Sequence, residues 1–437
     1  MGNKKIIYLA TLLSVIPTIL LADDNTIKDS SIKISGEIDP KYGIVNQSKD
    51  FRNDLSSPTN KYKQNSLATS GSLKFNYDQK TEKGLGYGGY IKLNTNTSKT
   101  SSGSENIANE LKIYLEGNFG KFEVGSTSPV GSSMEVNSYS LARATGGLDG
   151  EWSDWLKNGG VLTSSSGSKY AIDGNYITAP QLPVGFDETT KAGKINYFSP
   201  KLNDFTFGLS YVPDSKAKGT VNQTRKVLNN SGGGYKDIWQ PAVGYEKSFG
   251  NGVKFTTAIL GEFGKAKKIS YFDSIDDAKS TTTPPIEGSR NNLKAWQVGA
   301  GIGYQGFAFN GAYGDIGKSG TLVGDTNSKQ GGQYWSLGSA YATDKYGISI
   351  EYMQSKRAGA LAKYTPEGST DDLLVKFDQK DYNKFEAISI GADYTVMPGF
   401  MPYIEVTRFN FKKNENFGND AKFNKGTVVL AGTKIKF

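Results

Sequence analysis

Residues 110–126 read ELKIYLEGNFGKFEVGS and alternate between apolar and polar side chains on both sides of a Gly-Asn-Phe-Gly turn. Leu111, Ile113 and Leu115 share one face before the turn, and Phe122 continues that face after it. A period of two indicates β-strands, because successive side chains point to opposite faces. The segment is therefore predicted to be a hairpin. In a soluble sandwich its apolar face would lie inside, whereas in a membrane barrel that face would lie outside, against lipid.

The same alternation recurs along most of the chain. It predicts about 16 strands of roughly 8 to 12 residues, a length that can cross a bilayer at a tilt. The pattern is clearest at residues 32–38, 72–77, 85–93, 195–211, 243–259, 296–309, 335–352, 388–406 and 429–437.

The connections between the predicted strands alternate between short turns and long polar loops. Short turns are expected near Gly84, Asn118, Asn203, Asn251, Gln305, Asp344 and Pro398. Long loops are expected at residues 46–65, 126–190, 213–234, 264–292 and 356–383. This rhythm is typical of transmembrane β-barrels, which have short periplasmic turns and long external loops.

Many aromatic residues lie close to the expected short turns. High strand propensity alone would scatter them along the strands. Their position instead predicts a ring at the level of the lipid headgroups. The residues are Tyr77, Tyr87, Phe119, Phe122, Tyr197, Phe205, Tyr245, Phe249, Tyr304, Phe307, Tyr341, Tyr346, Tyr394 and Phe400.

These patterns predict an all-β fold, a transmembrane antiparallel β-barrel of about 16 strands with short periplasmic turns and long external loops. A closed barrel leaves no strand edge unpaired, as a bilayer requires. Its apolar face points outward to lipid, and its polar face lines the lumen. A barrel of this width encloses an aqueous channel, because its side chains cannot fill the interior.

The N-terminal segment has the features of a secretory signal peptide. Two lysines precede an apolar run that ends at Ala22, a small residue suited to cleavage. Pro17 interrupts the run, which argues against a permanent membrane anchor. We therefore predict a signal peptide at residues 1–22, a barrel domain at residues 23–437, and export to the bacterial outer membrane.

Two residue types are missing from the chain. Without cysteine there are no disulfides and no thiolate chemistry. Without histidine, the usual proton carrier of outer-membrane barrel enzymes is lost, so we predict no enzyme activity, no metal site and no cofactor. The formal net charge of +8 is spread evenly over an exported chain, so nucleic acid is not an expected partner.

Three stretches resemble segments of the Gram-negative general porin family. Residues 194–214, KINYFSPKLNDFTFGLSYVPD, resemble its hairpin with a tyrosine before a Ser-Pro turn. Residues 110–126 resemble its earlier hairpin, in which a Gly-x-Phe-Gly turn leads towards the third loop. The terminal KGTVVLAGTKIKF, which ends at Phe437, is similar to the family's outer-membrane sorting signal.

The resemblance carries further implications. It implies a homotrimer and a third external loop that folds into the lumen and narrows the pore. It also implies that the barrel-assembly machinery reads the signal ending at Phe437. Outer-membrane lipid and lipopolysaccharide are the remaining expected partners.

The connection at residues 126–190 is far longer than an ordinary loop and is therefore expected to be functional or disordered. Its centre contains two tryptophans, which can bury area against the barrel wall. The same stretch carries the carboxylates of Asp149, Glu151 and Asp154. We predict that these three form the acidic side of a pore constriction.

Lysines on polar strand faces are the candidates for the opposite, basic side. Lys74, Lys92 and Lys112 fall near the middle of three consecutive strands, and Lys194 lies on a later one. An acidic loop facing a basic wall would set up a transverse field across a narrow aqueous gap. The alternative is that each lysine is simply solvated, as charges on any lumen wall are. The family's basic wall is commonly rich in arginine, whereas this chain has lysine at these positions, a flexible point charge and not a planar fork.

GAGIGYQG, at residues 299–306, has the glycine content of a nucleotide-binding loop. It lies within an alternating strand and no helix follows it, so we assign it to the barrel. The function predicted from the sequence is an outer-membrane porin for passive diffusion of small hydrophilic solutes and ions. A solute-selective channel and a surface-binding barrel, either an adhesin or a receptor, remain the alternatives.

Overall fold

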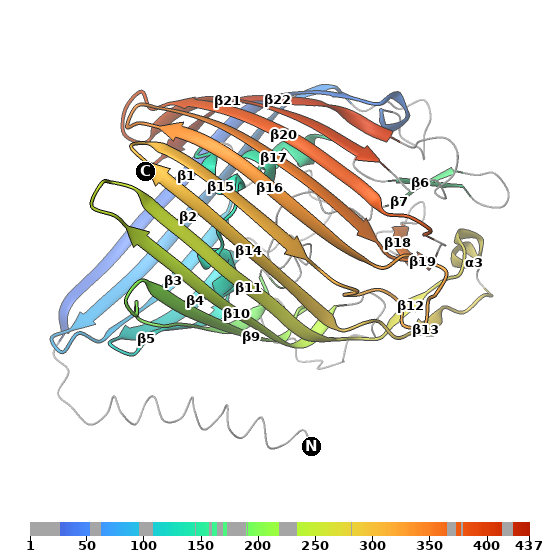
Figure 1. Cartoon of the computed structure of the whole chain (residues 1–437), viewed down its shortest axis with the longest axis horizontal. Helices are drawn as coiled ribbons and strands as arrows, with labels where there is room; N and C mark the ends of the chain where they lie inside the picture. Colours follow the sequence, from blue (N-terminus) through green and yellow to red (C-terminus); the bar gives the residue numbers. More distant parts are fainter. Residues whose placement is uncertain are drawn as a thin grey trace, which may run out of the picture.

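The computed structural model shows a single closed antiparallel β-barrel (Figure 1). The predicted signal peptide at residues 1–22 lies outside the described part of the chain. The described residues are 27–52, 63–95, 108–144, 146–156, 160–163, 169–172, 189, 191–217, 234–280, 282–364, 373–376, 379–412 and 423–437.

Sixteen strands form the barrel, in sequence order around its circumference. They are β1 (Ile27–Gln47), β2 (Asn65–Thr81), β3 (Gly86–Asn94), β4 (Ala108–Gly117), β5 (Gly120–Ser126), β8 (Gly193–Phe198), β9 (Phe205–Asp214), β10 (Tyr235–Ser248), β11 (Lys254–Ala266), β14 (Leu293–Tyr304), β15 (Phe307–Asp315), β16 (Gly331–Ala342), β17 (Tyr346–Ala358), β20 (Asn383–Tyr394), β21 (Phe400–Lys412) and β22 (Phe423–Lys436). The predicted all-β, 16-stranded barrel is confirmed.

Pairing between the first and the last strand closes the barrel. β1 runs antiparallel to β22 from Glu37, opposite Lys436, to Gln47, opposite Gly426. The closure extends to the chain end, where the Gly36 amide donates to the Phe437 carbonyl at 2.8 Å. Each barrel strand therefore has a neighbour on both sides, as a bilayer requires.

The opening hairpin of β4 and β5 shows which face meets lipid. Leu111 is 55% exposed and Ile113 66% exposed on the outside of the barrel, whereas Glu123, on the opposite face, is buried. On β1, Ile32 and Ile34 are likewise exposed. An apolar surface that would be a liability in water is the required surface in hydrocarbon.

The two ends of the barrel differ as predicted. Tight turns join the strands at the end that holds Phe437, and several contain residues with positive φ, including Gly84, Asn203 and Gln305. At the other end, long connections form small folded units (Figure 1). These are the hairpin β12 (Ile269–Tyr271) and β13 (Ile286–Gly288), the helix α3 (Ile275–Lys279), and the sheet β19-β18-β7-β6.

The small external sheet combines two distant loops. β6 (Gly160–Thr163) and β7 (Lys169–Ile172) come from the connection after β5, and β18 (Leu361–Tyr364) and β19 (Leu373–Lys376) from the connection after β17. Short helices complete the fold at α2 (Val130–Met134), η1 (Lys49–Phe51), η2 (Tyr139–Leu141), η3 (Gly147–Asp149) and η4 (Glu151–Trp155). No helix in the described ranges is long and apolar enough to cross a membrane.

The orientation of the hairpin yields a stability prediction. Ile113→Lys places a charge on the lipid face of β4, near the middle of the strand, and is expected to destabilise the inserted barrel by about 2–4 kcal/mol. Asn76→Lys, on the lumen face of β2, is the matched control and should cost far less. Urea unfolding of both variants in lipid vesicles checks this. Equal losses in the two variants would contradict the assignment of the faces.

Candidate pore constriction

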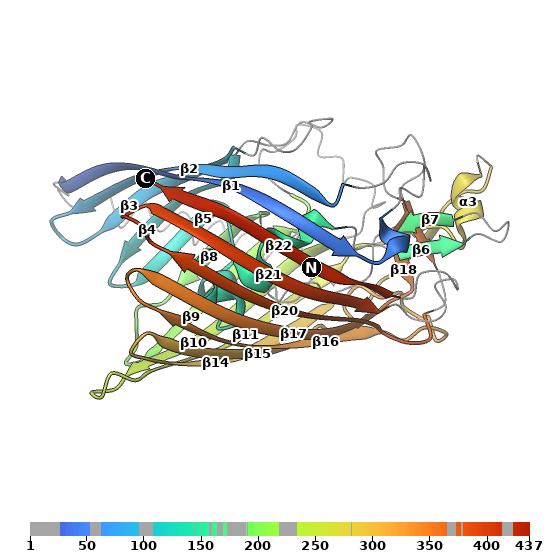
Figure 2. The ribbon, with the colours of Figure 1, turned by 90° about the horizontal axis from the view of Figure 1, so that it is seen from above.

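The helical part of loop L3, which we define as residues 127–192, enters the lumen from α2 to η4, whereas β6 and β7 of the same loop lie in the sheet at the external end. Figure 2 shows its helical segment inside the barrel, surrounded by strands. Its described central part begins at α2 beside β9 to β11 and ends at η4 beside β22 and β1. L3 therefore follows the inner wall along most of the circumference.

Glycines on the lumen face make room for L3. A Cβ atom at Gly208 would lie 2.6 Å from the Met134 sulfur, and one at Gly299 would lie 1.8 Å from the Val136 carbonyl oxygen. At Gly43, on β1, a Cβ atom would fall 2.4 Å from the Trp155 ring. Each distance is shorter than a non-bonded contact permits, so only glycine allows this approach of the loop to the wall.

Polar anchors fix L3 to the same strands. The Val130 amide donates to Ser210 on β9 at 2.9 Å, and Arg143 pairs with Asp393 on β20 at 2.5 Å. The Leu148 amide donates to Glu351 on β17 at 2.8 Å. These bonds give the buried amides of Val130 and Leu148 acceptors on the wall, as packing inside a wall demands.

Trp152 is the apolar anchor of L3. Its side chain is fully buried, and its ring stacks on Phe385 at 6.1 Å and on Phe409 at 5.8 Å between centroids. Its indole nitrogen donates to the Leu148 carbonyl at 3.0 Å, so the polar edge is satisfied as well. The lumen faces of β20 and β21 are thus aromatic where L3 covers them.

The three predicted carboxylates lie on the exposed side of L3. Asp149 ends η3, and Glu151 and Asp154 lie on η4; all three residues are exposed. Glu151 accepts a hydrogen bond from Lys41 on β1 at 2.5 Å, and Lys41 also pairs with Asp39 at 3.0 Å. Glu151 therefore ties L3 to the wall as well as adding charge.

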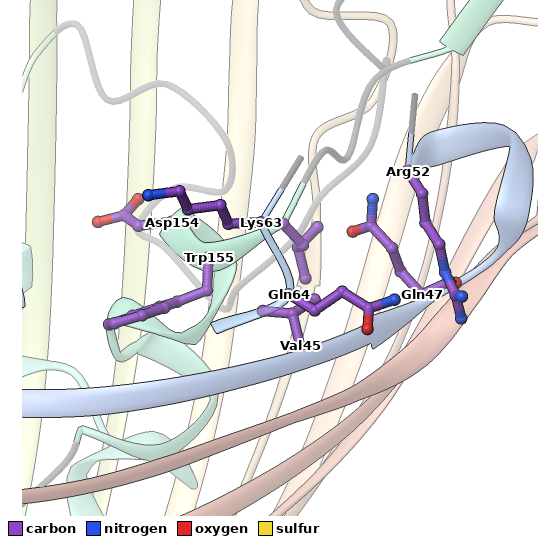
Figure 3. Close-up of a pocket in the computed structure, with 8 residues that line it drawn as sticks. Val45, Gln47, Arg52, Lys63, Gln64, Asp154 and Trp155 are labelled. Atoms are coloured by element: carbon purple, nitrogen blue, oxygen red, sulfur yellow. The ribbon is translucent and has the colours of Figure 1, made fainter. Parts of the chain in front are cut away.

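Asp154 lies at a cavity of about 280 Å³ beside the ends of β1 and β2 (Figure 3). Val45 and Trp155 give it an apolar side, and the Lys63 side chain extends towards Asp154 across its mouth (Figure 3). The cavity is lined by Val45, Gln47, Arg52, Lys63, Gln64, Asp154, Trp155 and Leu156.

Lys74 and Lys92 lie on the part of the wall between the two ends of the L3 arc. They are direct cross-strand partners on β2 and β3, and Lys92 in turn lies opposite Glu110 on β4. Within the described ranges, no carboxylate lies within 4.0 Å of either lysine. Two like charges held side by side are mutually destabilising, so the pair concentrates positive potential on this wall.

Lys112 and Lys194 have local partners instead. Lys112 pairs with Glu123 at 3.0 Å and lies over the Tyr90 ring at 5.6 Å. Lys194 is 3% exposed and donates to the carbonyl oxygens of Thr127 and Thr189. It therefore holds the two ends of L3 together and is screened from the lumen.

Several residues at this site were missed by sequence reasoning. Lys41, Glu351 and the glycines that face the lumen hold L3 in place, and none was singled out. GAGIGYQG contained a signal for this site, because Gly299, Gly301 and Gly303 all fall on the lumen face of β14. Alternate glycines on the polar face of a strand mark where another backbone approaches. In the described ranges, no group of His, Cys, Asp or Glu residues could hold a metal ion.

The chain matches the model of the Gram-negative porin family over residues 10–414. An uncharacterized protein of Rickettsia bellii is 24% identical over 99% of this chain and 100% of its own length. An uncharacterized protein of Rickettsia conorii is 25% identical over 78% of each chain.

Solved porin structures have the same fold. The anion-selective porin from Comamonas acidovorans superposes with a TM-score of 0.55 at 12% identity, covering 94% of this chain and 100% of its own. The outer-membrane OmpT of Vibrio cholerae gives a TM-score of 0.52 at 10% identity, covering 95% and 100%. With the family match spanning nearly the whole sequence and the barrel closed by sixteen strands, the chain belongs to the Gram-negative porin family.

Proposed function

We propose that this porin forms a water-filled channel in the outer membrane through which small hydrophilic solutes and ions diffuse passively. The observation that carries the proposal is the course of L3. The loop is anchored along the wall from β9 to β1, and the charged wall of β2 and β3 lies beyond its arc. A narrowed but unplugged lumen is the expected result.

The charges on the two sides of this gap support a constriction with a transverse field. Asp149 and Asp154 supply the acidic side on L3, and Glu151 contributes less because Lys41 neutralises it at close range. Lys74 and Lys92 supply the basic side, and Lys112 contributes less because Glu123 neutralises it at close range. Low-dielectric walls focus such a field on passing ions. The unpaired lysines favour anions.

A solute-selective channel is the second candidate. The cavity at Trp155 offers an aromatic face, the cationic residues Arg52 and Lys63, and the carboxylate of Asp154 at the external mouth. These groups match a small polar solute with an apolar part. A surface-binding barrel, the other alternative, could enclose the same channel, because its binding surface would lie on the external loops.

The cellular context belongs to the same proposal. Family membership supports a homotrimer, export by a signal peptide at residues 1–22, and assembly through a C-terminal signal ending at Phe437. Phe437 is 63% exposed at the end of the closing strand, where a receptor can reach it. Diffusion through such a channel requires no catalytic step and no cofactor.

A titratable group also bears on the docking of L3. Burial raises the pKa of the Glu135 carboxyl to about 7; the nearby Asp149 carboxylate adds to the rise, and a hydrogen bond from Tyr139 opposes it. In a released loop the Glu135 carboxyl would have its ordinary pKa of 4.5. Glu135 therefore holds its proton more tightly when L3 is docked. Docking is therefore strongest below pH 4.5 and weakens as the pH rises to about 7.

The first prediction from this proposed function concerns ion selectivity. Lys74→Gln/Lys92→Gln should shift the reversal potential under a salt gradient towards cations in planar bilayers. A change of one kT in the potential of the gap changes the cation-to-anion ratio by about sevenfold. Lys236→Gln/Lys265→Gln, at the external rim, is the control and should leave the potential unchanged. Identical reversal potentials in wild type and the first variant would remove these lysines from the constriction.

The second prediction concerns the anchor of L3. Trp152→Ala should weaken docking of the loop by about 3–5 kcal/mol, as expected for a fully buried tryptophan. Single-channel conductance should then rise or become noisy, because L3 no longer holds one position. Trp335→Ala removes the same side chain from the lipid face and should conduct like the wild type. A quiet, unchanged conductance in Trp152→Ala would show that L3 does not set the pore size.

The third prediction concerns pH. Current fluctuations of the wild-type channel should increase between pH 4.5 and pH 7, as Glu135 loses its proton and docking weakens. Glu135→Gln should flatten this part of the profile, since its amide does not titrate. Recordings from both proteins across this range test the assignment. An unaltered pH profile in Glu135→Gln would assign the titration to another group.

A further inference from the structure

The outer surface of the barrel carries a row of lysines that faces lipid. Lys356 on β17 lies directly opposite Lys384 on β20, which lies opposite Lys412 on β21. Lys384 and Lys412 are exposed, and Lys356 is half-buried. Neighbouring residues of the same strands, such as Ser355 and Phe385, are buried on the inner face. All three lysines therefore point away from the lumen.

Two more cations extend the row. Arg408 on β21 and Lys425 on β22 are exposed at positions that also face outward. Arg408 lies opposite Ile388 on β20, and Lys425 lies opposite Asn410 on β21. We define the outer basic patch as Lys356, Lys384, Arg408, Lys412 and Lys425.

The patch lies at the height of the external lipid headgroups. Ten residues separate Lys356 from Tyr346, which adjoins the tight turns. At about 3.3 Å per residue and a tilt near 40°, this span rises about 25 Å, the thickness of the apolar band of such barrels. The same interval separates Lys384 from Tyr394 on β20.

The neighbouring strands carry aromatic residues towards this end. Tyr211 and Trp239 pair at 4.7 Å between ring centroids, Trp296 and Tyr313 at 5.5 Å, and Trp335 and Tyr352 at 5.2 Å. This external girdle was not foreseen, since only the ring near the tight turns was predicted. Tyr352 on β17 lies opposite Ile388 on β20, which in turn lies opposite Arg408 on β21. The girdle thus gives way to cations at β20 and β21.

The lysine row has no close ion-pair partner in the described part of the chain, and Asp381, which pairs with Lys329, interacts with Lys384 only at longer range. Within the described ranges, no carboxylate lies within 4.0 Å of the Lys356, Lys384 or Lys412 ammonium group. Glu386 lies two residues further along β20 from Lys384, on the same face of the strand. Its carboxylate accepts a hydrogen bond from the Asn410 amide at 2.9 Å. Like charges directly opposite each other across strands cost stability, so an external anion is the expected source of compensation.

Aromatic neighbours hold two of the ammonium groups at the surface. Lys356 lies over the Tyr382 ring at 5.0 Å, and Lys412 lies over the Phe423 ring at 5.7 Å. Such contacts reduce the freedom that a long lysine side chain must lose on binding. The row is thus partly ordered in advance.

We propose that the outer basic patch binds the phosphate groups of a lipid in the external leaflet. Adjacent strands are about 4.8 Å apart, so the row spans about 10 Å. That span suits a headgroup with two separated phosphates. The lipid's acyl chains would then lie on the exposed apolar residues below the patch, such as Ile390 and Val406. The proposal rests on the outer-membrane location of the porin and not on its solute preference.

The test uses the folded, detergent-purified porin and lipid A bearing two phosphates as the probe, with binding followed by native mass spectrometry. Each lysine near an anionic surface contributes a factor of about five to binding. Lys356→Gln/Lys384→Gln/Lys412→Gln should therefore weaken binding by about a hundredfold. Lys236→Gln/Lys265→Gln/Lys294→Gln removes three lysines from the rim on β10, β11 and β14 and should bind like wild type.

Four outcomes would overturn the proposal. Equal affinity in the two triple variants would make the attraction non-specific. Undiminished binding of dephosphorylated lipid A would show that phosphate is not recognised. Binding of inorganic pyrophosphate as tight as that of lipid A would show that the patch binds a soluble anion. A changed oligomeric state in the first variant alone would make the patch a contact between copies. Bilayer conductance of the same variant tests the channel separately and should be unchanged.

Discussion

The pairing of β1 with β22 is the contact on which the rest of the structure depends. An open sheet of this size would expose two rows of unpaired amides and carbonyls, which hydrocarbon does not tolerate. Closure removes both edges and also fixes which residues face the lumen. A shift of one residue in this register would turn the polar set of β1 towards lipid. The chain terminus takes part directly, through the bonds between Gly36 and Phe437.

Closure by sixteen strands leaves a lumen too wide for side chains to fill, and L3 occupies part of that space. The loop can dock because the inner wall is shaped for it. Glycines such as Gly299 admit its backbone, and Phe385 and Phe409 receive Trp152. Its anchors run along β9 to β22 and reach β1, so the wall of β2 and β3 is left to face the solution. The asymmetry of the pore follows from where the glycines and aromatic residues lie.

Lysine has three different roles in this barrel, depending on the face and on the partner. Lys74 and Lys92 form a close pair of like charges on the lumen wall, whereas Lys194 is buried and holds the two ends of L3. Lys384 is the third kind, facing lipid at the external rim. In each case the strand's period of two selects the face, and the depth along the strand selects the surroundings. Charge alone therefore does not identify a pore residue.

The sequence by itself determined the strands, the turns and the outward direction of the apolar face, because alternation and turn residues are local properties. It also marked residues 126–190 as an unusually long loop that carries three carboxylates, whereas entry of this loop into the lumen was implied by the porin resemblance. Only the tertiary structure decided the path of L3, since Leu148 meets Glu351 across 203 residues and Glu151 meets Lys41 across 110. The cross-strand rows likewise became visible only with the register, which aligned Lys356 with Lys384 and Lys412. Such pairings depend on which strands become neighbours, and no local pattern encodes that.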